Sequence, residues 1–221
     1  MEAQVDVGQR VGGGVQHAGL IGQHEDVAAR AGRVGVLGRR SAVDRAERDP
    51  AEWETFVNSL TTNLTSFFRE AHHFDILAER LKKHAGRNPL RIWCSAASTG
   101  EEPYSLAITA CEAFNTMTPP VQIVATDIDT NVLATAQAGV YGLDRVDRLS
   151  RERMQRFFLK GTGSQAGFAR VRPELQRLIN FTRVNLLDAR WPIQGPLDAI
   201  FCRNVMIYFD KPTQYQILKK F

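Results

Sequence analysis

Several absences narrow the classes of protein to which this sequence can belong. The chain of 221 residues has three cysteines, Cys94, Cys111 and Cys202, too few and too widely spaced for a disulfide scaffold or a CxxC metal site. Its apolar runs are too short to cross a bilayer, and Met1 to Arg10 lack the regions of a signal peptide. We therefore expect a cytoplasmic protein with no direct membrane insertion.

Aromatic side chains are absent from the first 48 residues. This segment also lacks lysine and holds nine of the 17 glycines. A segment of this composition buries too little apolar surface to offset the entropy lost when it is ordered. We therefore expect residues 1–48 to be disordered or a non-native N-terminus, and interpret His17 and His24 as solvated side chains.

A strong charge imbalance is also absent. The net charge is +4, with 43% hydrophobic and 24% charged residues, which is ordinary for a globular protein. Aromatic and basic residues do not interleave, so nucleic-acid binding is not expected.

The arginines from Arg145 to Arg156 are either a solvated helix face or a surface for an acidic partner. The adjacent His72 and His73 point to different helix faces, so we expect no metal site.

From Asp49 onward, helical and strand patterns alternate. Apolar residues at helical spacing predict a helical segment over residues 49–85. Buried-strand patterns then cover residues 90–97 and 121–129, and helical patterns cover residues 101–114 and 130–139. This alternation is typical of a doubly wound, Rossmann-like α/β sheet, which we expect over residues 86–221. Short strands around glycines predict a small antiparallel insertion at about residues 157–184.

The loop after the first predicted strand, SAASTGEEPYS, favours a cationic ligand. It has one glycine where a dinucleotide-binding fold has GxGxxG, which argues against a nicotinamide-dependent oxidoreductase. Glu101 and Glu102 would repel phosphates and suit the sulfonium and amino group of S-adenosylmethionine (SAM), although either residue can also simply complement the helix dipole. Asp127 ends the second predicted strand, where a carboxylate can accept hydrogen bonds from both ribose hydroxyls.

Five separated motifs carry a family resemblance: NLTSFFRE, SAASTGEEPYSLA, ATDID, VNLL and DAIFCRNVMIYF. In this order and spacing they resemble the chemotaxis receptor methyltransferases (CheR-type protein-glutamate O-methyltransferases) over residues 49–221. The resemblance implies a SAM-dependent enzyme that forms glutamyl methyl esters on the cytoplasmic helices of chemoreceptors during chemotaxis adaptation. Its product from SAM is S-adenosylhomocysteine (SAH), and we expect the protein to be a monomer.

The resemblance also implies the residues of the site. Those that match cofactor contacts are Asn63, Thr65, Arg69, Glu102, Asp127, Asn185, Leu186, Arg203 and Asn204. Those that match groups beside the transferred methyl are Arg69 and Tyr208. Those that match the receptor-tail site of some members, which bind a C-terminal pentapeptide of the receptor, are Gly161, Gly163, Gly167 and Arg170. We expect the tail to pair with an edge strand around Arg170; the alternative is a hairpin whose glycines serve only its turn.

The sequence departs from the family pattern at both ends. Residues 1–48 do not resemble the family's N-terminal helical domain, so residues 49–85 would be a remnant of it or a linker. The family's sheet continues with further strands beyond Phe221, so we expect a C-terminally truncated domain with an exposed edge strand around Ile200. Two other functions stay open: a catalytically incompetent fragment that binds SAM or a receptor tail, and a SAM methyltransferase with another substrate.

Overall fold

The computed structural model describes residues 49–84, 86 and 89–221. The expectation for residues 1–48 lies outside this part of the chain. The chain divides into two compact units, and helix α3 (Pro50–Leu60) belongs to the smaller one. The Asp49 side chain caps α3 by accepting a hydrogen bond from the N–H of Ala51 at 2.9 Å. The larger unit contains all described residues from Asn63 onward.

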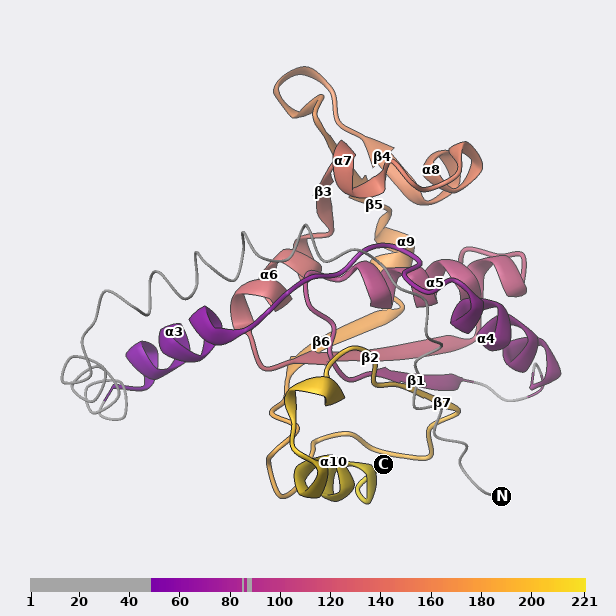
Figure 1. The fold of residues 1–221 in the computed structure, drawn as a ribbon. Coiled ribbons are helices and arrows are strands. Elements are labelled where there is room, and N and C mark those ends of the chain that lie inside the picture. The colour runs from indigo at the N-terminus through magenta and orange to yellow at the C-terminus, as the bar shows by residue number, and fades with distance from the viewer. Residues whose placement is uncertain (1–48, 85, 87–88) are drawn as a thin grey trace, which may run out of the picture. The chain divides into compact units, whose positions relative to one another are not determined.

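A four-stranded parallel sheet forms the centre of the larger unit (Figure 1). Its order is β6-β2-β1-β7, with β1 (Leu90–Cys94), β2 (Val121–Asp127), β6 (Ile179–Arg183) and β7 (Ala199–Phe201). The chain moves from β1 outward through β2 to β6 and then returns to place β7 on the other side of β1. The order therefore reverses beside β1, and ligands of open α/β sheets bind at the carboxyl ends of the strands at such a point. The predicted doubly wound α/β fold is confirmed.

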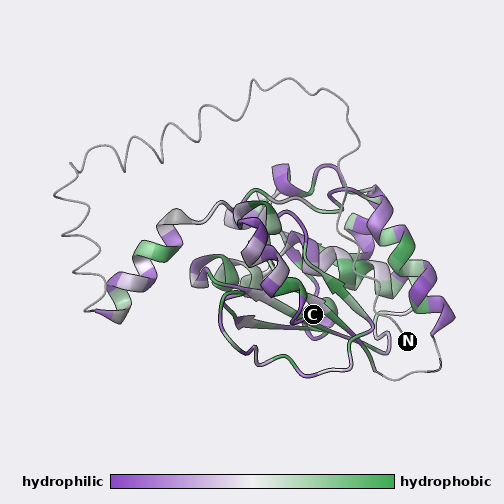
Figure 2. Cartoon of the chain, turned by 60° about the horizontal axis from the view of Figure 1, so that its bottom comes forward, coloured by the Kyte–Doolittle hydropathy of each residue, from purple (hydrophilic) through white to green (hydrophobic). Residues whose placement is uncertain are grey.

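Helices cover both faces of this sheet (Figure 1). One face carries α4 (His72–Lys83), α5 (Glu101–Ala113), α6 (Thr130–Ala138) and α9 (Pro173–Gln176). The other face carries the 3-10 helix η2 (Met206–Tyr208) and α10 (Lys211–Leu218), whose buried Ile217 packs with Trp93. Figure 2 shows hydrophilic and hydrophobic residues alternating around α4, which buries Phe74, Leu77 and Leu81 against the core.

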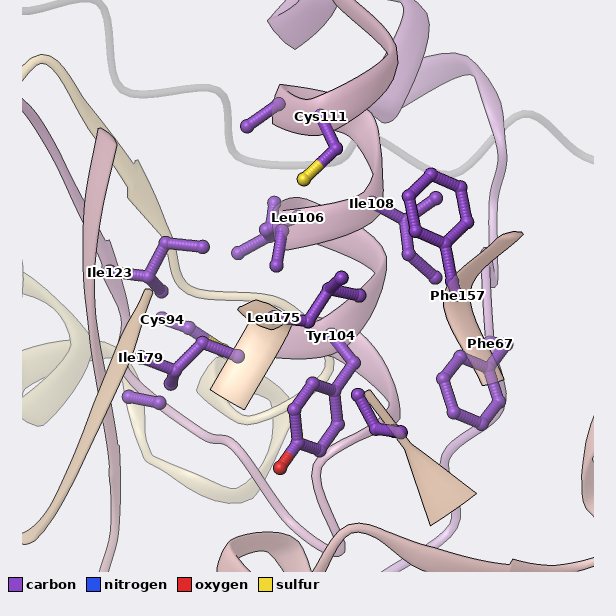
Figure 3. Packing of buried hydrophobic residues seen from close by; sticks show 14 of the residues in the cluster. Phe67, Cys94, Tyr104, Leu106, Ile108, Cys111, Ile123, Phe157, Leu175 and Ile179 are labelled. Atoms are coloured by element: carbon purple, nitrogen blue, oxygen red, sulfur yellow. The ribbon is translucent and has the colours of Figure 1, made fainter. Parts of the chain in front are cut away.

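Helix α5 lies at the centre of the larger hydrophobic cluster and is buried over most of its length. Figure 3 shows Leu106 pointing toward Ile123 of the sheet, while Ile108 lies beside Phe157 on the other side of the helix. One apolar helix thus contacts both the main sheet and the segment that follows α6. Such a helix fixes its N-terminal end, where Glu101 and Glu102 begin it, relative to both layers.

A second, antiparallel sheet of three strands has the order β3-β5-β4. Its strands are β3 (Val140–Gly142), β4 (Phe158–Lys160) and β5 (Phe168–Val171), joined through α7 (Leu143–Val146), α8 (Arg151–Phe157) and the 3-10 helix η1 (Gly163–Gln165). The small sheet therefore spans residues 140–171, whereas the expected insertion covered residues 157–184. Strand β6, counted in that insertion, pairs with β2 in the parallel sheet instead. The periodicity of a short strand does not reveal which sheet it joins.

The predicted helical segment over residues 49–85 is interrupted. Helix α3 ends at Leu60 and α4 begins at His72. Between them, Phe68 and Glu70 adopt left-handed backbone conformations with φ of 52° and 55°, which ordinary side chains rarely adopt. No glycine or proline marks this break in the sequence. Within the part of the chain that the structure describes, no helix is long and apolar enough to cross a membrane.

Candidate cofactor site

The loop after β1 closes against the carboxyl end of β2. The Ala97 N–H donates to the Thr126 carbonyl at 2.8 Å, and the Ser98 N–H donates to Oδ2 of Asp127 at 2.8 Å. The loop then turns through Gly100, whose φ is 100°. A Cβ at this glycine would lie 2.7 Å from the hydroxyl oxygen of Tyr141. The only glycine of the loop is therefore required for both its backbone conformation and the close approach of Tyr141.

Asp127 and Asp129 have different environments. Asp127 accepts backbone N–H groups on both oxygens, from Ser98 and from Asp129 at 3.1 Å. Burial raises its pKa above the ordinary value, although these hydrogen bonds oppose the shift. Asp129 is buried and caps α6 by accepting from the N–H groups of Asn131 and Val132. A carboxylate has about four acceptor positions, so Asp127 retains capacity for ribose hydroxyls, while Asp129 serves the helix.

The two glutamates at the start of α5 point to different partners. Glu101 is fully buried and pairs with Arg145 of α7, and it accepts a hydrogen bond from the Thr99 hydroxyl at 2.6 Å. Glu102 accepts from Nη1 of Arg203 at 2.7 Å and from the Cys94 thiol at 3.3 Å. Burial raises the pKa of Glu102, and the Arg203 charge opposes that shift. Glu101 therefore joins the small sheet to the loop, and Glu102 faces the site.

Arg203 connects β7 to the segment before α4. Besides Glu102, its guanidinium donates to the carbonyl of Arg69 and, at 3.2 Å, to Oε2 of Glu70. Its side chain is only 9% exposed, and its Nε is buried with no hydrogen-bond partner among the residues that the structure describes. A buried N–H donor without an acceptor is costly. The carboxylate of a SAM amino-acid group is an acceptor that would satisfy it, so the residues here fit that end of the cofactor.

The other predicted cofactor residues have contacts of their own, separate from the pair formed by Glu102 and Arg203. Asn63 donates to Oδ2 of Asp129 at 3.1 Å, and Thr65 is half-buried in the same segment. Asn185, after β6, accepts the N–H of Leu187 at 2.9 Å and shapes the turn there. The next residue, Leu186, is buried in the cluster with Trp93.

Arg69 and Tyr208, which the family resemblance places beside the transferred methyl group, have fewer contacts than Arg203. Arg69 donates from Nη1 to the carbonyl of Leu64 at 2.9 Å. Tyr208 lies in η2 and is 59% exposed. Asn204, at φ 55°, extends its amide to within 3.5 Å of Oε1 of Glu70. Among the described residues, no hydrogen bond joins the side chains of Arg69 and Tyr208.

The predicted receptor-tail residues lie in and around the β4–β5 loop. A Cβ at Gly161 would lie 1.8 Å from the carbonyl oxygen of Gln165, so only glycine fits there. Gly163 has φ 57°, whereas a Cβ at Gly167 would meet no atom of the described residues within 4 Å. Arg170 lies on β5, which pairs with β3 on one side and β4 on the other. The expectation that β5 is an edge strand is therefore wrong: β3 and β4 are the edges.

Sequence reasoning missed Glu70. It follows Arg69 in the FFRE motif and resembles an ordinary surface glutamate of a helix. Its role as a partner of Arg203 depends on the left-handed turn at residues 68 and 70 and on a contact across 133 residues of chain. Neither leaves a local sequence signal. The contact of the Cys94 thiol with Glu102 likewise has no sequence signal, although Cys94 lies within the buried-strand pattern predicted for residues 90–97.

An α/β domain with acidic residues at the carboxyl ends of β1 and β2 is typical of nucleoside-cofactor binding. Residues 63–221 match the family model described as CheR methyltransferase, SAM binding domain. The chain belongs to this family.

Comparison with curated relatives gives the same family. The chain is 58% identical over 175 residues to chemotaxis protein methyltransferase 2 of Pseudomonas aeruginosa, covering 79% of this chain and 62% of that protein. It is 51% identical over 185 residues to the chemotaxis protein methyltransferase of Salmonella typhimurium, covering 84% and 64%. The corresponding protein of Escherichia coli is 49% identical over 170 residues, covering 77% and 59%. The chain therefore spans about three-fifths of the length of these relatives.

Proposed function

We propose that this chain binds SAM and transfers its methyl group to glutamate side chains of chemoreceptors, forming glutamyl methyl esters. The observation that carries the proposal is the pair formed by Glu102, at the start of α5 after β1, and Arg203, after β7, at the sheet edge where Asp127 ends β2, in a chain that matches the SAM-binding domain of its family. The names of the relatives support chemotaxis as the setting.

The residues of the site divide the cofactor between them. Asp127 accepts hydrogen bonds from the ribose hydroxyls, because it ends β2 and lies next to the loop that carries Ser98. Glu102 attracts the cationic amino group, and the unpartnered Nε of Arg203 takes the carboxylate. Asn63, Thr65, Asn185, Leu186 and Asn204 complete the pocket from neighbouring loops.

The chemistry requires alignment rather than proton transfer. SAM supplies an electrophilic methyl group on a sulfonium. The acceptor glutamate has a reference pKa of about 4.3 and is already ionised at neutral pH, so no general base is needed. Arg69 would orient the acceptor carboxylate, and the Tyr208 hydroxyl would contact the methyl group of the bound cofactor. The Arg69 carbonyl accepts a hydrogen bond from Arg203, and Tyr208 lies in η2, which follows Arg203 in the chain. Alignment of the reacting atoms would provide the rate enhancement.

Receptor recognition belongs to the small antiparallel sheet. We place the C-terminal pentapeptide of a receptor along an edge of this sheet, at β3 or β4, with the glycine loop and Arg170 beside it. Edge strands offer unpaired backbone groups to an extended peptide. The cytoplasmic helices of the receptor present the glutamates, and the enzyme acts as a cytoplasmic monomer.

The experiment is transfer of labelled methyl from SAM to a receptor cytoplasmic fragment. The product is expected to release its label as methanol in alkali, as a carboxyl ester does and an N-methyl group does not. The matched control is Asp127→Ala, with its fold checked by circular dichroism, and it should transfer no label. A folded wild-type chain that binds SAH but labels no receptor would contradict receptor methylation, and an alkali-stable label would indicate another substrate.

A further inference from the structure

Glu70 contacts two residues of the proposed cofactor site without being one of its predicted members. Its Oε2 lies 3.2 Å from Nη2 of Arg203, and its Oε1 lies 3.5 Å from the amide nitrogen of Asn204. Its left-handed backbone, with φ 55°, follows a similar turn at Phe68. Strained backbone of this kind persists where surrounding contacts hold it, and it is concentrated at functional sites.

Arg203 is shared between two carboxylates. It contacts Glu102 at 2.7 Å on one side and Glu70 at 3.2 Å on the other. With both carboxylates ionised and the His73 imidazole, 3.6 Å from Oε2 of Glu70, neutral, one guanidinium neutralises one carboxylate, and Glu70, Glu102 and Arg203 together carry one net negative charge. Without Glu70, the pair formed by Glu102 and Arg203 would be neutral.

The two forms of the cofactor differ in charge at the reacting sulfur. SAM has a sulfonium, an ammonium and a carboxylate and is a monocation, whereas SAH lacks the sulfonium charge and is neutral overall. A net negative cluster therefore stabilises bound SAM more than bound SAH. This difference does not depend on how the shared amino-acid group is held, because that group is the same in both ligands.

We propose that Glu70 is a specificity-determining positioning residue, which acts through its contact with Arg203 to raise the affinity of the site for SAM relative to SAH. The inference rests on the proposed function. It assigns to Glu70 a role in favouring the charged methyl donor and in releasing the neutral product.

The test is calorimetric titration of the wild-type chain and of Glu70→Gln with SAM and with SAH. No acceptor is present, so no methyl is transferred. In Glu70→Gln the ratio of the dissociation constant for SAM to that for SAH is expected to rise about threefold, a modest factor because solvent screens a partly exposed charge. Glu70→Asp, which keeps the charge, should stay near the wild-type ratio. The control Glu79→Gln removes an exposed glutamate of α4 and should leave the ratio unchanged.

Two results would overturn the inference. If Glu70→Gln weakens binding of both ligands equally, Glu70 only supports the fold of the site. If neither affinity changes, the charge of Glu70 has no effect on ligand binding at the cofactor site. Failure of the wild-type chain to bind either ligand would instead refute the proposed cofactor site, so the two failures are distinguishable.

Discussion

Single residues at the centre of the site depend on one another. Glu102 and Arg203 have side chains only 12% and 9% exposed and pair at 2.7 Å. Removing one member of such a pair leaves a buried charge without compensation. Replacing the other member as well removes that charge, so the two substitutions should not be additive.

We therefore expect Arg203→Met to lower the free energy of unfolding by about 3 kcal/mol, measured by urea denaturation. Adding Glu102→Gln to Arg203→Met should recover part of this loss, because a neutral amide needs no counter-charge. The double variant should still bind SAH much more weakly than the wild type, since both charges that face its amino-acid group are gone. A double variant less stable than Arg203→Met would show that the two side chains are not coupled in this way.

Among the elements, the β4–β5 loop makes a separate prediction about receptor recognition. Gly161→Ala would force a Cβ to within 1.8 Å of a backbone carbonyl, so the loop must move, whereas Gly167→Ala meets open space. We expect Gly161→Ala to methylate a receptor with its C-terminal pentapeptide no faster than one lacking it. Gly167→Ala should keep the difference between the two receptors, and both variants should bind SAH as the wild type does. Identical receptor preference in the two variants would refute a role for this loop in tail binding.

The elements also show what the sequence could predict. Strands β1 and β2 and helices α5 and α6 follow clear local patterns and were predicted close to their observed bounds. The break between α3 and α4 was missed because Phe68 and Glu70 adopt left-handed conformations without glycine. Two predictions were wrong for one reason: β6 was assigned to the small sheet, and β5 was assigned to its edge. Strand order is set by contacts between distant segments, which local periodicity does not encode.

The same limit applies to the site. The placement of Glu102, Asp127 and Arg203 at one edge of the sheet was predictable because they end or follow strands, and parallel strands bring their carboxyl ends together. Their partners were not predictable, since Glu70 approaches Arg203 through a turn with no sequence signature. The separate orientations of Glu101 and Glu102 also required three dimensions, because neighbouring residues of a helix start face different layers.

For the whole molecule, the question is whether the described sheet suffices to hold a cofactor. The chain spans about three-fifths of its relatives' length, and within the described residues β7 pairs with β1 alone. The predicted nucleoside and amino-acid contacts nevertheless all lie between Asn63 and Asn204, inside one compact unit. We therefore expect this chain to bind SAH by itself.

The most direct measurement is calorimetric titration of the chain with SAH, with Asp127→Ala as the control and circular dichroism to verify that both are folded. Saturable binding by the wild-type chain, reduced at least tenfold in Asp127→Ala, is the expected result; a factor of ten corresponds to about 1.4 kcal/mol of lost hydrogen bonding. A folded wild-type chain that does not bind SAH, or an Asp127→Ala variant that binds it equally well, would contradict the site at the ends of β1, β2 and β7.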